Sequence, residues 1–143
     1  MPATDLARVI VAGILGAISM AVATFLFNAV RVPVVDFGRL LATKILRYHS
    51  HGTRLGLVLH LVNGVLLALV YAILIEPQLA PFIQFYWLRG LLYGFALWLM
   101  LMMVVLPIVG DGFFGGRGRS GMVGSALVVH LIYGLILGFA FKD

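Results

Sequence analysis

The sequence contains no cysteine and few charged residues, and both shortages restrict what the protein can be. Of its 143 residues, 10% are charged and 63% are hydrophobic, and the mean hydropathy is +1.14. Without thiols the chain forms no disulfide, no cysteine-ligated metal site and no iron–sulfur cluster. Because a soluble domain carries about 25% charged residues, this composition indicates a protein that lies within a membrane.

Acidic residues are the scarcest charged class, and none lies in the middle of an apolar run. The five acids are Asp5, Asp36, Glu76, Asp111 and Asp143. Ion-coupled transporters ordinarily need an acid inside the membrane, and a hydrolase triad needs an acid beside a histidine. We therefore expect a non-enzymatic protein. The net charge of +5 reflects membrane topology and gives no reason to infer nucleic acid as a partner.

Long apolar runs are what the sequence has in abundance. A helix needs roughly 20 apolar residues to cross a hydrocarbon core of about 30 Å. Four segments have this length: 9–30, 55–75, 87–109 and 121–141. An Ala-x-Ala pattern follows the first run, but with only Arg8 before it we expect a retained span and no signal peptide. The sequence predicts an all-α membrane protein, with residues 1–143 forming a single four-helix transmembrane bundle.

Basic residues predict how this bundle is oriented. They concentrate in the first and third loops, on the side that the positive-inside rule assigns to the cytoplasm. Those loops hold Arg31, Arg39, Lys44, Arg47, Arg54, Arg117 and Arg119, and the other side holds Arg8, Arg89 and Lys142. The aromatic segment 82–87 would anchor the far interface. We expect a bacterial inner-membrane protein with both termini outside the cytoplasm.

The two halves of the sequence resemble each other, which indicates a duplicated two-helix hairpin. Segments 57–71 and 127–141 share six of fifteen residues without a gap, including a histidine followed four residues later by a glycine. We assign the first repeat to about residues 9–76 and the second to about 87–141. Tandem hairpins imply a pseudo-two-fold axis along the membrane normal. We expect the second and fourth spans to face each other across it.

Small residues recur at every fourth position in all four spans, which lets helices approach closely in lipid. Gly13 and Gly90 hold corresponding places in the looser match between the first and third spans. The glycines that we expect to carry helix packing are Gly56, Gly64, Gly90, Gly94, Gly134 and Gly138.

His60 and His130 are a matched polar pair inside these stripes, and intramembrane histidines are functional candidates. One hypothesis is that they ligate a haem b iron axially, with Arg54, Arg89 or Arg119 meeting the propionates. The opposing interpretation is that each neutral imidazole hydrogen-bonds a neighbouring helix. Its partners would then be Ser19, Asn28, Asn63, Ser125 or Tyr133. A third possible role for the two histidines is to handle protons or ions. We expect them to bind a metal only if haem is present.

Each repeat also contains a cytoplasmic turn with a proline and an aspartate, Asp36 in the first and Asp111 in the second. Asp36 is expected to cap an amphipathic helix that runs to Tyr48. Its basic residues Arg39, Lys44 and Arg47 would face anionic lipid headgroups.

Several motifs together resemble a known family. They are Pro33 with Asp36, HLVNG at 60–64, Tyr71-Ala72, RGLLYG at 89–94, Trp98-Leu99, PIVGDGFF at 107–114, and Ser125 with HLIYG at 130–134. This set resembles an uncharacterised family of small four-span bacterial integral membrane proteins. The resemblance implies a fold and a membrane location and implies no reaction or cofactor.

Small-residue faces without a catalytic cluster favour a structural or accessory subunit that packs against other membrane helices, with Trp98 as a candidate contact. Its partners would be the lipid bilayer and other membrane subunits, or further copies of the chain. Two alternatives stay open at this point. One is the b-type haem protein described above, and the other is a small self-associating pore or lipid-handling protein.

Overall fold

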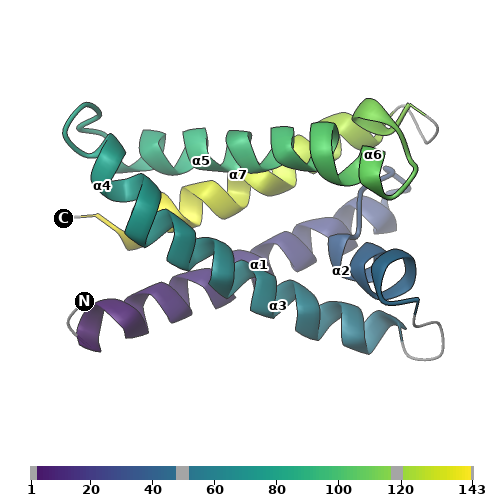
Figure 1. The fold of residues 1–143 in the computed structure, drawn as a ribbon, viewed down its shortest axis with the longest axis horizontal. Helices are drawn as coiled ribbons and strands as arrows, with labels where there is room; N and C mark the ends of the chain where they lie inside the picture. Colours follow the sequence, from purple (N-terminus) through teal and green to yellow (C-terminus); the bar gives the residue numbers. More distant parts are fainter. Residues whose placement is uncertain (1–2, 48–51, 117–120, 143) are drawn as a thin grey trace.

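A computed structural model describes residues 3–47, 52–116 and 121–142, and within these ranges every regular element is helical. Four stretches are long and apolar enough to cross a membrane: Leu6–Ala29, Arg54–Leu79, Tyr86–Ile108 and Met122–Ala140. They correspond to the four spans predicted from the sequence, so the all-α membrane architecture is confirmed. The two chain ends lie at the same end of the bundle (Figure 1).

The spans are built from one or more consecutive helices. The first is α1 (Ala3–Ala29), and the second joins α3 (Gly52–Val70), the π-helical turn η2 (Tyr71–Ile75) and α4 (Glu76–Leu79). The third joins α5 (Tyr86–Met100), the π-helical turn η3 (Leu101–Val105) and α6 (Leu106–Ile108), and the fourth is α7 (Met122–Ala140). Between them lie α2 (Phe37–Leu40) with the π-helical turn η1 (Leu41–Ile45), and the 3-10 turn η4 (Phe113–Gly115).

The π-helical turns in the second and third spans each precede a proline. Pro77 and Pro107 lack the N–H that an α-helix needs, and their rings press on the carbonyl four residues earlier. The preceding residues instead bond five positions back, Glu76 N–H to the Tyr71 carbonyl and Leu106 N–H to the Leu101 carbonyl. This wider turn relieves the crowding. The second span therefore continues to Leu79, beyond the end at 75 that we expected.

Close backbone contact joins the two helices of each hairpin at corresponding glycines. In the first hairpin, a β-carbon added at Gly13 of α1 would lie 2.7 Å from the Cα of Val65 in α3. In the second, Gly90 of α5 and Gly134 of α7 each face the other's carbonyl oxygen. Gly13 corresponds to Gly90 in the proposed repeat. The shared position is consistent with a duplicated hairpin, and the duplication itself stays a prediction.

Between the hairpins, the arrangement differs from the one we expected. The close pair is α1 with α7, whereas α3 and α7, expected to face each other, are not among the closely packed helices. Gly16 of α1 explains this, because its missing side chain leaves room for the ring of Tyr133 on α7. In the proposed second repeat, Tyr93 takes the place of Gly16. Tyr93 contacts α3 through its hydroxyl, which donates to the Leu67 carbonyl at 2.8 Å, and α3 and α5 are not among the closely packed helices.

An intramembrane cavity lined by two histidines

A cavity of about 350 Å³ lies between α1, α3, α7 and the segment that leads into α2. It forms because α1 and α3 cross near their middles and diverge toward the end of the bundle where α2 lies (Figure 1). His60 and His130 both line it, so the structure brings the two predicted residues to one wall. A second cavity of about 60 Å³ shares both histidines and continues toward α5.

His60 is held by a neighbouring helix. Its Nε2 atom lies 3.1 Å from the carbonyl oxygen of Ala17 on α1. A carbonyl oxygen only accepts hydrogen bonds, so Nε2 carries the proton and donates. The other ring nitrogen, Nδ1, is enclosed by protein and has no hydrogen-bond partner among the described residues. The hydrogen bond to a neighbouring helix agrees with one of our interpretations, although a backbone carbonyl and no side chain is the acceptor.

His130 is held by its own helix instead. Its Nδ1 atom lies 2.7 Å from the carbonyl oxygen of Ala126, one turn earlier in α7. By the same argument Nδ1 donates, and a neutral ring then keeps an unprotonated Nε2. The two histidines correspond in sequence, yet they use different ring nitrogens and different helices to hold their rings.

The lining of the larger cavity combines a few polar side chains with a mainly apolar surface. At the α2 end it contains the polar side chains of Thr24, Asn28 and Asp36. Apart from His60 and His130, the rest of the lining is mostly apolar, with residues such as Met20, Phe37, Ala126 and Val129. Phe25 and Leu57 at its edge are 72% and 51% exposed, so the cavity opens on a face that lipid would cover. The lining therefore matches a molecule with a polar end and an apolar body.

The histidine geometry restricts haem binding. Axial ligation by both rings needs an unprotonated nitrogen from each, and in His60 one nitrogen donates to Ala17 while the other is enclosed. Ligation would thus require the His60 ring to leave Ala17. Arg54 is exposed, Arg119 lies outside the described residues, and Arg89 pairs with an acid at the opposite end of the bundle. Within the described chain, no group of three His, Cys, Asp or Glu side chains gathers. The haem hypothesis stays a prediction.

All six glycines expected to carry helix packing lie inside the bundle. Gly64 meets Ala17 of α1, and Gly56 meets Gly38 of α2. Gly90, Gly94, Gly134 and Gly138 all lie at the contact between α5 and α7. Trp98, which we expected to contact a partner, is only 9% exposed, and its indole N–H donates to the Val123 carbonyl. The small-residue faces are therefore occupied within the chain itself.

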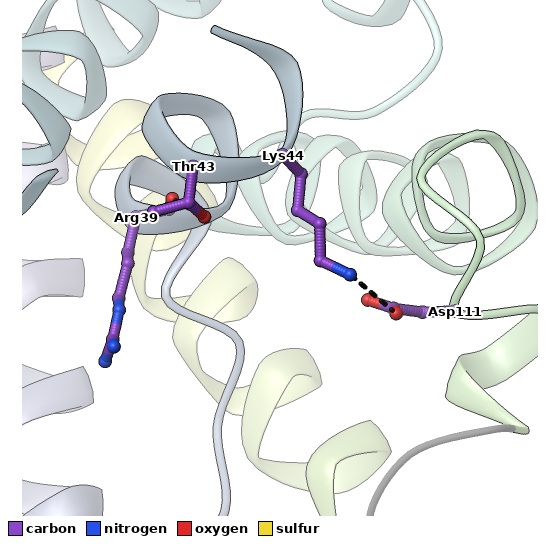
Figure 2. A network of polar contacts seen from close by, with 4 residues as sticks. All are labelled: Arg39, Thr43, Lys44 and Asp111. Atoms are coloured by element: carbon purple, nitrogen blue, oxygen red, sulfur yellow. Dashed lines mark hydrogen bonds and ion pairs between the residues drawn. The ribbon is translucent and has the colours of Figure 1, made fainter. Parts of the chain in front are cut away.

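The two aspartate turns have different roles. Asp36 caps α2, as predicted, because its carboxylate accepts the Arg39 N–H at 2.9 Å. Asp111 instead lies 3.8 Å from the ammonium group of Lys44 at the end of the bundle where α2 lies, whereas the Arg39 side chain points away from this pair (Figure 2). Arg39, Lys44 and Arg47 are all exposed, which leaves them accessible to headgroups. Tyr48, the expected end of this helix, lies outside the described residues.

Sequence reasoning missed a buried ion pair at the end of the bundle that holds both termini. The Arg89 guanidinium lies 3.0 Å from the Glu76 carboxylate, and their side chains are only 4% and 14% exposed. In the orientation predicted from the sequence, Arg89 counts as a loop charge. One base and one acid, each close to the end of adjacent spans and separated by a short connection, were the signal that could have revealed this pair.

Together, the four apolar spans and the cavity between them define a class, a small four-span α-helical integral membrane protein with an intramembrane cavity. Residues 3–143 match the Family of unknown function (DUF6789), and the chain belongs to that family. No curated protein and no solved structure matches the chain.

Proposed function

We propose that this protein is a non-enzymatic membrane protein that binds a single amphiphilic molecule in the cavity beside His60 and His130. The cavity carries the proposal. Its volume of about 350 Å³ falls within the range of roughly 300–1,000 Å³ typical of small-molecule sites. It also combines an apolar interior with a few polar groups, as such sites do. This corresponds to the lipid-handling alternative and requires no pore.

The accessory-subunit hypothesis has less support from the geometry. It rested on small-residue faces that could receive other membrane helices. Those faces are used by contacts between α1 and α3 and between α5 and α7. Gly124 of α7 is a small residue with open space around it, but a single glycine does not form a face. Assembly with other subunits therefore stays a prediction, separate from the proposed binding function.

Filling the cavity tests the proposal. Ala21 lines the cavity, and Val22, the next residue of α1, is 53% exposed and does not line it. We expect Ala21→Phe to abolish binding and Val22→Phe, the matched control, to leave it unchanged. Binding would be measured by photo-crosslinking a diazirine-labelled fatty alcohol to the protein in vesicles, followed by peptide mapping.

Wild-type adducts should concentrate on the cavity-lining segments of α1 and α3. Equal labelling of Ala21→Phe and wild type would refute the proposal. So would adducts spread evenly over the lipid-facing residues of α1, because that distribution describes a protein that is only solvated by lipid.

A further inference from the structure

The hydrogen bonds to Ala17 and Ala126 determine which nitrogen of each histidine remains able to accept. A neutral imidazole has one N–H donor and one acceptor nitrogen. His60 donates through Nε2 and His130 through Nδ1, since both partners are carbonyl oxygens. The acceptor nitrogens are then Nδ1 of His60 and Nε2 of His130. Both rings line the same two cavities.

Resting on the proposed binding function, we infer that the ligand is an amphiphile whose polar end donates a hydrogen bond, that is, an alcohol or a phenol. Esters, ethers and ketones only accept hydrogen bonds, and they would bring an acceptor against the acceptor nitrogen of His130. A hydroxyl group would instead donate to it. Nδ1 of His60 is also an acceptor without a partner among the described residues, but protein encloses it, so His130 carries the inference.

A hydroxyl also fits the charges of the site better than an ammonium group. Among the described residues that line the two cavities, Asp36 is the sole acid, and it is exposed at the α2 end. Its carboxylate already accepts the Arg39 N–H. An ammonium group placed beside the histidines would therefore lack a counter-ion inside the membrane, which is costly. A neutral donor has no such cost.

A pair of ligands that differ in one proton donor tests the inference. We would titrate para-octylphenol and its methyl ether, para-octylanisole, into bilayer nanodiscs that contain the protein with 15N-labelled histidines. We expect the phenol to bind about tenfold more tightly, the effect of one hydrogen bond, and to shift the Nε2 resonance of His130. The spectra of the protein alone should show the proton on Nε2 of His60 and on Nδ1 of His130.

The outcomes separate the two proposals. If the ether binds as tightly as the phenol and Ala21→Phe blocks both, the donor inference is wrong and the binding function stands. If neither ligand binds to the cavity, the binding function itself fails. In His130→Leu the preference for the phenol should disappear while binding of the ether persists. A preference that survives this change, or a wild-type spectrum with the protons on the other nitrogens, overturns the inference even if the variant misfolds.

Discussion

At the scale of single residues, close contact between helix backbones stabilises this bundle, because the hydrophobic effect does not drive helices together inside lipid. In lipid, helices associate through van der Waals contact and hydrogen bonds between helices. Glycines supply the first of these, and tyrosine hydroxyls supply the second. Tyr133 on α7 donates to the Gly64 carbonyl, and Tyr93 on α5 donates to the Leu67 carbonyl, so both bond to α3. Both bonds tie the less closely packed second span to the second hairpin.

Gly90→Ala tests the role of close approach. The new methyl group would meet the Gly134 carbonyl of α7, so we expect the free energy of unfolding to fall by about 1–3 kcal/mol. Gly124→Ala is the matched control, because nothing lies within 4 Å of its added β-carbon. Unfolding by a denaturing detergent, followed by tryptophan fluorescence, measures both. A loss of stability in Gly124→Ala as large as in Gly90→Ala would contradict this explanation.

At the scale of elements, an ion pair links the end of the second span to the start of the third. Glu76 begins α4 and Arg89 lies in the first turn of α5, with the loop at 80–85 between them. The π-helical turn η2 accommodates Pro77, so the second span continues as a helix through Glu76, which lies beside Arg89. A buried charge left without its partner is destabilising, whereas a pair replaced by neutral residues often is not.

The Glu76 and Arg89 pair therefore predicts a non-additive double mutant. We expect Glu76→Gln and Arg89→Met each to lower the free energy of unfolding by about 3–5 kcal/mol, as breaking a buried pair does. The double variant should recover much of this loss, because it leaves no buried charge. A double-mutant cycle on unfolding free energies provides the measurement. Additive losses would show that the two side chains act independently.

At the scale of the whole molecule, the described cations divide unequally between the two ends of the bundle. Arg31, Arg39, Lys44, Arg47 and Arg54 are exposed near α2, whereas Arg8 and Lys142 are the exposed cations described at the end with the termini. Burial of Arg89 against Glu76 removes a third charge from that end. Five described cations are thus exposed near α2 and two at the other end, and from this excess the positive-inside rule predicts that the α2 end faces the cytoplasm.

This orientation can be measured directly because the chain has no native cysteine. We expect a cysteine at Gln84, in the exposed loop before α5, to react with a membrane-impermeant maleimide in intact cells. A cysteine at Leu46, 54% exposed after η1, should react only after the membrane is opened. The reverse pattern would place the termini in the cytoplasm. Labelling of both sites in opened membranes is the control for folding and accessibility.

Sequence reasoning succeeded where a local pattern has one structural outcome. Apolar runs of the right length can only be helices in a bilayer, because every backbone group must be bonded internally. The Asp36 cap likewise depends on residues within one turn. Sequence reasoning did not predict which helices pack together, because that depends on contacts between residues far apart in the chain. The pairing of α1 with α7 depends on Gly16 and Tyr133, and the proposed repeat has other residues at the corresponding positions.

The sequence by itself determined that this is a four-span helical membrane protein, since hydrophobic length and the spacing of small residues are properties of each segment alone. Only long-range packing settled which helices meet: α1 approaches α7 whereas α3 does not pack closely against α7, and the cavity between these helices has His60 and His130 in its lining. The contact of α1 with α7 depends on side-chain volume, because Gly16 leaves room for the Tyr133 ring.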